Sequence, residues 1–313
     1  MNSSFTKKIL RFTFTLDGGV FDTSGNDTLT VQGLRSQISI SQASGILAQA
    51  DIQIYGLLQS DMNALTTFRL MGQFSKTGIQ RNTVMVEAGD EETGLTTVFF
   101  GDIVNSCAEY QGAPDVYLKI EAMVNANLKL APAKTLSYKG LVDAKIIFQD
   151  IAKNAGMELE IDDSLSRNIR TPYLTGSAIN QARTLADAID CDIVYEGNNK
   201  MVVVSKGVAR KQKGEVPHLD KWSGLINYPS FDNYFCLFDC LYRPDIVMNG
   251  AVNVVLPVEL ANKVGANIGA KQDNNEVITT WYIQGLSIIL TAETPHGLWA
   301  MKCSAQNNQL LPA

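Results

Sequence analysis

Polar and apolar residues alternate along most of the first 131 residues, which is the pattern of β-strands with one buried face. The alternation is clearest over residues 34–40, 50–54 and 116–124. Glycine-, asparagine- and proline-containing turn signals separate these runs, at 17–19, 24–27, 89–90 and 111–114. The pattern predicts antiparallel strands of a small β-barrel or sandwich. It also predicts one short helix capped by Ser60, with Met62, Leu65 and Phe68 facing inward.

The spacing of apolar residues changes to that of helices after Asp143. Between Asp143 and Gly156 the apolar residues fall on one helical face, and Gly156 is a typical helix stop. A strand at 157–161 follows, then a second helix that begins after Ser177, then a hairpin over 193–204. Residues 134–206 are therefore predicted to form a compact α/β insert of helix, strand, helix and hairpin.

Strand-like alternation returns in the last third of the chain, at 234–242, 252–256 and 286–290. A polar stretch of about 20 residues lies between Pro257 and Glu276, with weak helical character at 259–264. We therefore expect three domains: a β-barrel over 1–133, the insert over 134–206, and a second β-barrel over 207–313.

The two β regions share an order of elements that suggests distant copies of one unit. Each has a short aromatic strand, then a long strand, a turn containing proline and glycine, and a closing strand. The first copy covers residues 99–122 and the second covers 281–304. The predicted fold class is thus mainly β, with two related antiparallel barrels of the tube type flanking the α/β insert.

Composition and charge narrow the class of protein. The chain has 313 residues, of which 45% are hydrophobic, so sizeable cores can form. Apolar runs are far shorter than the roughly 20 residues of a membrane span, and no signal-peptide core follows the N-terminus, so we expect synthesis in the cytoplasm. A net charge of −6 disfavours tight binding to nucleic acid. We interpret the one basic cluster, Lys206, Arg210, Lys211 and Lys213, as a solvated linker.

The five cysteines are an odd number and are scattered, which favours buried free thiols over a disulfide framework. Cys236 and Cys240 lie in one strand-like run. Residues four apart in a strand are about 13 Å from each other, so this pair can neither bond nor share a metal ion. No metal or cofactor is predicted.

Catalytic motifs of the common classes are missing from the sequence. His218 and His296 each lie beside a proline in an expected loop, and there is no phosphate-binding glycine run or zinc-protease motif. Acidic groups that could act as a glycosidase pair are Asp90, Glu91, Glu92, Asp162 and Asp163. They occupy turn-like positions where acids solvate a loop or cap a helix. The sequence therefore predicts a protein that is not an enzyme, and we assign no catalytic residue.

Several segments together point to a known family: residues 34–57, 62–66, 82–90, 98–103, 111–116, 143–156, 171–176, 228–231, 281–290 and 293–299. In this order they resemble segments of the baseplate hub proteins of contractile-tailed (myovirus-type) bacteriophages. Together they span nearly the whole chain. They are turns and core positions, so their number and order carry the resemblance.

The resemblance implies a structural virion protein of the tail baseplate. In that family three subunits form a ring with six similar barrels, which adapts the sixfold tail tube to the threefold central spike and lines the DNA channel. The implied partners are further copies of the chain, the tail tube, the spike, other baseplate proteins and a tape-measure protein, and DNA passes without specific binding. Two features depart from the family: the long 257–276 stretch, and bulky Ile46 and Leu47 in the first hairpin.

Three alternatives remain open from the sequence. The chain could be the hub of a contractile secretion or bacteriocin-like particle, which differs from a phage hub in company and not in sequence physics. It could be a tail-tip cell-wall hydrolase that uses the acids named above. It could also be a receptor-binding protein at the tail periphery, which would bind host surface in isolation.

Overall fold

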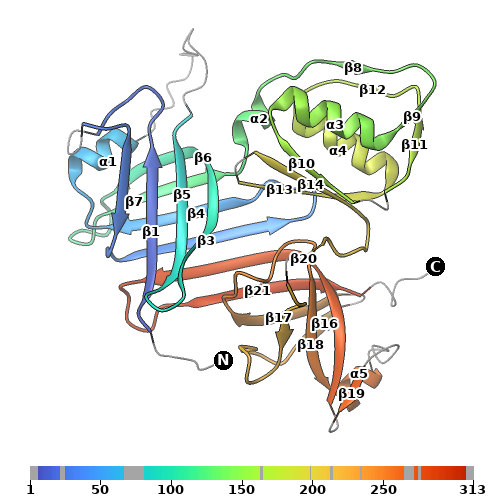
Figure 1. Ribbon diagram of the computed structural model, residues 1–313. Coiled ribbons are helices and arrows are strands. Elements are labelled where there is room, and N and C mark those ends of the chain that lie inside the picture. Colours follow the sequence, from blue (N-terminus) through green and yellow to red (C-terminus); the bar gives the residue numbers. More distant parts are fainter. Residues whose placement is uncertain are drawn as a thin grey trace.

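The computed structural model describes residues 6–21, 25–66, 81–162, 165–197, 199–211, 214–232, 235–263, 271–273 and 276–307. In this part of the chain, β-strands predominate and five short helices accompany them. Figure 1 shows the N-terminal strands (blue to cyan) above the C-terminal strands (orange to red), with the helical part of the chain (green to yellow) beside the N-terminal strands. The predicted class, mainly β with a small α/β portion, is confirmed.

A 14-stranded sheet forms the body of the described structure. Its main path is β16–β17–β21–β20–β3–β4–β7–β6–β5–β1–β2, and β18, β15 and β19 join it beside β20. The bounds, in path order, are Ser230–Asp232, Phe235–Leu241, Trp299–Gln306, Glu276–Ala292, Ser36–Ala43, Gln49–Tyr55, Tyr117–Met123, Gly94–Glu109, Thr83–Asp90, Lys8–Thr15 and Thr28–Gln32. The three further strands are β18 (Ala251–Pro257), β15 (His218–Leu219) and β19 (Lys271–Asp273).

The two predicted barrels are not seen as separate closed barrels among the described residues. Instead, β3 of the N-terminal half pairs along its whole length with the second part of β20, from Ser36 with Ala292 to Ala43 with Gly285. The edges that would close each half are joined to each other, so one open sheet runs through both halves. Sequence periodicity could not predict this, because it reports which face of a strand is buried and not which strand lies beside it.

The two halves nevertheless repeat one strand order. The first half runs β3–β4–β7–β6–β5 and the second runs β16–β17–β21–β20–β18, all antiparallel. The central pairs match in length: β4 and β7 pair from Gln49 with Met123 to Tyr55 with Tyr117, as β17 and β21 pair from Phe235 with Gln306 to Leu241 with Ala300. The order of strands is therefore the same in both halves.

The long strands β6 and β20 also share a β-bulge at the same place. In each half, the bulge follows the second residue pair counted from the C-terminal end of the neighbouring strand, which is β7 in the first half and β21 in the second. The register skips one residue of the long strand there, Val104 in β6 and Gln284 in β20. The pairs on either side are Ile103 with Ala122 and Asn105 with Glu121 in the first half, and Ile283 with Ala305 and Gly285 with Ser304 in the second. Bulges set the local bend and twist of a strand, so the two halves have the same irregularity as well as the same order.

The α/β portion lies between β7 and β15. Helix α2 (Ala126–Leu130) leads into α3 (Ala144–Ala155) and α4 (Ala178–Ile189), and the three-stranded sheet β10–β14–β13 is formed by Glu158–Ile161, Lys200–Ser205 and Cys191–Glu196. Helix α3 begins with an N-cap at Asp143, whose carboxylate accepts the Lys145 N–H at 2.9 Å, and ends at Gly156 in the left-handed conformation. The helix, strand, helix and hairpin predicted for this segment are confirmed.

Some local predictions need correction or fall outside the described residues. Helix α1 (Gln59–Leu65) begins one residue before Ser60, so Ser60 lies inside the helix and does not cap it. The N-cap residue of α1 is Leu58, which makes no side-chain hydrogen bond to the helix. Met62 and Leu65 are buried as expected, whereas Phe68 lies outside the described residues. Within the long polar stretch, α5 (Val258–Lys263) and β19 are described and most of the remainder is not. Two-stranded pairs that were not predicted are β9 (Leu141–Asp143) with β11 (Asn168–Arg170), and β8 (Leu136–Ser137) with β12 (Tyr173–Leu174).

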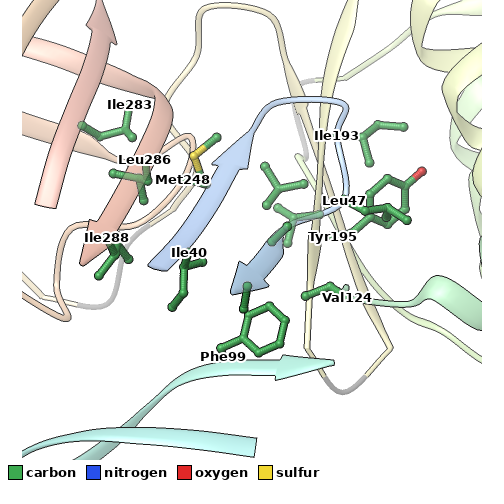
Figure 2. Close-up of a cluster of buried hydrophobic side chains, with 14 of the residues drawn as sticks. Ile40, Leu47, Phe99, Val124, Ile193, Tyr195, Met248, Ile283, Leu286 and Ile288 are labelled. Carbon is green, nitrogen blue, oxygen red and sulfur yellow. The ribbon is translucent and has the colours of Figure 1, made fainter. Parts of the chain in front are cut away.

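A buried apolar cluster joins the two halves of the sheet and the α/β portion (Figure 2). It gathers around the β3–β4 hairpin, and its labelled side chains are Ile40, Leu47, Phe99, Val124, Ile193, Tyr195, Met248, Ile283, Leu286 and Ile288. Leu47, one of the two bulky residues of this hairpin, is 5% exposed. Its side chain fills the point where the two halves of the sheet and the α/β portion meet, which explains its size. The backbone of the hairpin is fixed on both sides, because Gly45 N–H donates to Ile193 at 2.8 Å and Ser44 N–H donates to Gln284 at 3.3 Å.

No helix in the part of the chain that the structure describes is long and apolar enough to cross a membrane.

Candidate functional site: an assembly surface on the sheet

Asp90, the first candidate acid, has a structural role at the β5–β6 turn. Its carboxylate lies 2.9 Å from Lys8 Nζ and accepts hydrogen bonds from the backbone N–H of Glu92 and Thr93, at 3.1 and 2.8 Å. The Lys8 contact and the Thr93 bonds hold the pKa of Asp90 well below its ordinary value of 3.8. A carboxylate that stays ionised and fully bonded cannot serve as a general acid near neutral pH.

The other candidate acids do not join Asp90. Glu91 and Glu92 are exposed in the same turn. Asp162 follows β10 in the α/β portion, where its N–H donates to Val203, and Asp163 lies outside the described residues. The two acidic groups therefore belong to different parts of the fold.

His218 lies near an aspartate and a serine, but the three do not form a catalytic triad. Its Nε2 is 3.6 Å from Asp220 Oδ2, whereas the hydroxyl of Ser223 donates to the His218 backbone carbonyl at 3.1 Å and accepts the Asp220 N–H at 2.7 Å. A triad needs the serine hydroxyl on the imidazole, so this group is a hydrogen-bonded turn. His296, the second histidine, has a positive φ of 57° in the turn before β21.

All five cysteines are free thiols, as predicted. Cys236 and Cys240 are fully buried on the inward face of β17, and Cys107 alone is partly exposed. Burial raises the pKa of Cys236, and that of Cys191, to about 12, so neither is a thiolate at neutral pH. Among the described residues, no three histidine, cysteine, aspartate or glutamate side chains gather closely enough to hold a metal ion.

The most extended feature is the polar face of the sheet, opposite the buried core. Directly paired residues point to the same side of a sheet, so the registers define this face without ambiguity. It includes Gln37, Ser39 and Ser41 of β3, Gln49, Asp51, Gln53 and Tyr55 of β4, Tyr117, Lys119, Glu121 and Met123 of β7, Asn105, Cys107 and Glu109 of β6, Ser287, Ile289 and Thr291 of β20, Ala300, Lys302, Ser304 and Gln306 of β21, and Phe235, Leu237, Asp239 and Leu241 of β17. It spans both halves of the sheet without interruption.

The centre of the polar face carries uncharged polar side chains, other strands add aromatic and apolar ones such as Tyr117 and Leu237, and acids outnumber lysines among its charged members. Serine and glutamine predominate on β3 and β4, at the centre of the face. The charged members are four acids, Asp51, Glu109, Glu121 and Asp239, and two lysines, Lys119 and Lys302. A surface of this composition has little to hold a polyanion by electrostatic attraction.

Lys119 and Lys302 occupy equivalent positions in the two halves. Each lies two pairs beyond the β-bulge, where Lys119 is opposite Cys107 and Lys302 is opposite Ser287. Lys119 also lies 3.2 Å from Glu121, which raises the pKa of the lysine through a hydrogen bond and through charge attraction. The repeat of strand register thus extends to a charged side chain on the polar face.

A groove of about 750 Å³ lies where the two halves meet on this face. Ser41, Ser287, Lys302 and Asp239 line its polar part, and exposed Ile46 and Tyr228 lie at its border. Ile46, the second bulky residue of the first hairpin, therefore has a surface role, unlike Leu47.

An ion-pair cluster that the sequence did not predict fixes the segment after β14. Arg210, whose side chain is 10% exposed, contacts Glu196 and lies 3.0 Å from Glu160, and Lys200 lies 2.7 Å from the same Glu160. Burial alone would raise the pKa of Glu160, but Lys200 and Arg210 outweigh it and lower that pKa. The interpretation of the basic cluster as a solvated linker is wrong for Arg210. It holds for Lys206, whose pair with Asp190 is exposed, while Lys213 lies outside the described residues.

One sequence signal could have revealed this cluster. Glu196 and Lys200 flank the predicted hairpin turn, and Glu160 lies in the predicted strand at 157–161. If these strands form one small sheet, the opposite charges lie close together at its end. The next basic residues along the chain are Lys206 and then Arg210, and the charge pattern favours neither of the two for that end.

Comparison with known proteins gives two kinds of match. The sequence matches the family described as "Baseplate hub gp41" over residues 9–258. No curated protein matches the chain.

Three solved structures share its fold. The tail protein from Neisseria meningitidis MC58 has a TM-score of 0.59 at 9% identity, with 96% of this chain and 97% of that chain covered. The 43 kDa tail protein of prophage MuSo2 from Shewanella oneidensis has a TM-score of 0.58 at 9% identity, with 97% and 99% covered. The E. coli c3393 protein, described as a component of the type VI secretion system, has a TM-score of 0.56 at 8% identity, with 89% and 76% covered.

Proposed function

Because the chain belongs to the baseplate hub gp41 family and is thus a structural protein of the phage tail baseplate, we propose that three copies form a ring. The ring joins a sixfold tail tube to a threefold central spike. Its further neighbours are other baseplate proteins and a tape-measure protein. The chain is made in the host cytoplasm, becomes part of the virion, and is not an enzyme.

The observation that carries this proposal is the repeat of strand order, pairing register and bulge position in the two halves. We infer that residues 1–133 and 207–313 are diverged copies of one tube-type unit, with the α/β insert at 134–206 between them. A trimer would then present six similar units. Sixfold contacts could be made on the tube side while the differences between the two units keep threefold contacts on the spike side.

The polar face is the proposed wall of the DNA channel. Its opposite side is the apolar core, so it is the broad face of the sheet that remains available to solvent. Serine and glutamine side chains at its centre, and four acids against two lysines, favour passage of DNA without specific binding. In a trimer, Lys119 and Lys302 would form one ring of six lysines, spaced by the same repeat that relates the two halves.

The mass of the purified chain in solution tests the proposal. The chain is 34.2 kDa, so light scattering coupled to size exclusion should give about 103 kDa for the closed threefold association proposed here. Electron microscopy of the same fraction should show a ring with a central hole. A dimer, or an open chain of subunits without a hole, would contradict the adaptor.

Two of the alternatives lose support from the geometry. A cell-wall hydrolase would need two converging carboxyl groups, and Asp90 and Asp162 lie in different parts of the fold, each within its own backbone contacts. A contractile secretion hub would share this fold, as the E. coli protein does, but the family match over residues 9–258 favours the phage hub.

A further inference from the structure

The junction between the two halves of the sheet gives a template for the contact between subunits, and the argument rests on the proposed ring. Inside the chain, β3 is the outer strand of the first unit, and it pairs with the second part of β20 in the second unit. The pairs at the centre of this junction are Ser39 with Ile289, Ile40 with Ile288, and Ser41 with Ser287. One unit therefore presents an outer strand and the next receives it along a long strand.

The repeat provides the same two edges once more, and no described strand pairs with either of them. Strand β16 is the outer strand of the second unit and corresponds to β3. The end of β6, Cys107–Glu109, corresponds to Ser287–Ile289 of β20, and it pairs with β7 on one side only. Among the described strands, none pairs with the other side of Cys107–Glu109, and none pairs with the outer side of β16.

We propose that β16 of one copy pairs antiparallel with Cys107–Glu109 of the next copy, in the register of the internal junction. Ser39 is opposite Asp51 on β4, and Ser230 is opposite Leu237 on β17. Asp51 and Leu237 in turn lie opposite Glu121 and Ser304, the residues just after the two bulges. Ser230 therefore takes the place of Ser39.

Glu109 takes the place of Ile289 by the same count from the bulge. The inter-subunit pairs that follow are Ser230 with Glu109, Phe231 with Ala108, and Asp232 with Cys107. In this register the exposed Ser230 and the half-exposed Glu109 extend the polar face across the contact. Phe231, whose ring lies 5.8 Å from that of Trp281, points to the core side, as Ile40 does in the internal junction.

The chemistry of the edge also sets where the pairing ends. Pro229 would lie opposite Tyr110, and proline has no N–H to donate to a neighbouring strand. The contact is therefore a short ladder of three pairs, which suits a surface that must stay unpaired until assembly. Because the donor edge and the acceptor edge differ, the contact runs head to tail, and three copies related by a threefold rotation close it into a ring.

A pair of cysteines tests this register. In the internal junction Ser44 N–H donates to the Gln284 carbonyl, so Ser44 and Gln284 form a hydrogen-bonded pair. Hydrogen-bonded and non-hydrogen-bonded pairs alternate along an antiparallel ladder, and Ser39 with Ile289, five pairs further on, is therefore a non-hydrogen-bonded pair. Cα atoms in such pairs lie about 4.5 Å apart, within the range of about 4.4–6.8 Å that a disulfide spans. We therefore design Glu109→Cys with Ser230→Cys in a Cys107→Ser background. Mild oxidation should link three chains into a covalent species of about 103 kDa that a reductant returns to single chains.

Two matched variants in the same background control the test. Ser39→Cys with Ile289→Cys should form a bridge within one chain, because that junction is internal. Glu109→Cys with Leu237→Cys moves one cysteine to the next strand, about 4.8 Å further away on the same face, and should not form the bridge.

The outcomes separate this inference from the proposed function. A trimer by light scattering that gives no bridge at 109 and 230, while the internal control oxidises, would overturn the register and leave the ring. A bridge of equal yield with Leu237→Cys would also overturn it. A strict monomer at every concentration, with the internal control oxidised, would overturn both the register and the trimeric ring.

Discussion

Gly197, in the turn of the β13–β14 hairpin, lies directly against Phe100 of β6. A Cβ atom on Gly197 would come within 2.7 Å of the Phe100 Cβ and 3.1 Å of its carbonyl oxygen. Close by, Arg81 joins the same two parts of the fold, since it pairs with Asp102 at 2.7 Å and donates to Asn199 at 3.2 Å. The α/β portion is thus fixed to the N-terminal half of the sheet by a contact that has no room for a side chain.

Replacing Gly197 by alanine should weaken this contact. The backbone of β6 cannot move aside without breaking its pairs with β5, so we expect the free energy of unfolding to fall by about 1–3 kcal/mol. Urea denaturation followed by tryptophan fluorescence would measure it. Gly19→Ala is the matched control, because its nearest atom would be 3.4 Å away on the Leu16 side chain, and it should change stability little. Equal stability of the two variants would contradict the close approach.

Arg210→Ala should destabilise the segment that leads from the α/β portion to the second half. The variant leaves Glu160 and Glu196 with Lys200 as their remaining cation. Breaking a fully buried pair costs about 3–5 kcal/mol, and because the two carboxylates here are about one-third exposed we expect nearer 2 kcal/mol. Lys206→Ala removes an exposed pair with Asp190 and should cost under about 1 kcal/mol. Chemical denaturation of both variants gives the comparison.

Thr279→Val should leave a buried indole without its hydrogen-bond acceptor. Trp281 Nε1 donates to Thr279 Oγ1 at 2.7 Å, and that hydroxyl donates to the Val254 carbonyl at 3.1 Å, all inside the core of the second half. The loss should cost about 1–3 kcal/mol because the indole N–H stays buried. Thr280→Val, whose hydroxyl bonds Asn253 at the surface, is the control. If both valine variants unfold at the same urea concentration, the buried bond contributes nothing.

Asp90→Asn should make stability less dependent on pH in the acid range. The pKa of Asp90 is lowered in the folded protein by Lys8 and by the Thr93 bonds. A group whose folded pKa lies below its unfolded value contributes stability that is present above about pH 3.8 and is lost as the pH falls through the folded pKa. The variant should therefore be less stable than the parent at pH 7, and the difference should shrink below pH 3.8. A difference that stays constant from pH 7 to pH 2 would contradict the role of the carboxylate.

The sequence predicted the elements of this fold better than their arrangement. Helices α3 and α4 were located to within a residue because Asp143, Gly156 and Ser177 are strong capping residues. The long strands were each read as two strands, since the bulges after Ile103 and Ile283 shift the alternation of polar and apolar residues. Each bulge moves the following residues to the other face of the sheet. In the sequence this change of phase looks like the start of a new strand.

The pairing of β3 with β20 could not be predicted from the sequence, and neither could the choice of Arg210 over Lys206 as the partner of Glu160 and Glu196. Residues 36–43 and 285–292 are separated by most of the chain, and nothing in either strand specifies the other except an apolar face. The polar face could not be predicted for the same reason, because it depends on which strands lie side by side. Ser39, Ser41 and Ser287 are unremarkable as residues, and they become one face only after the registers bring their strands together.

Ser41→Trp tests the proposed channel wall. Ser41 is exposed on the polar face, so an indole there should project into the channel without disturbing the core. We expect the purified variant to keep the stability and the mass of the parent, and phage particles that carry it to assemble. Release of DNA from these particles should fall sharply, because three added indoles narrow the channel at one level. Lys153→Trp, on the exposed side of α3, is the matched control and should release DNA normally. Normal release from the Ser41 variant would place the channel wall elsewhere, and a lower mass in solution would instead assign this face to contact between subunits.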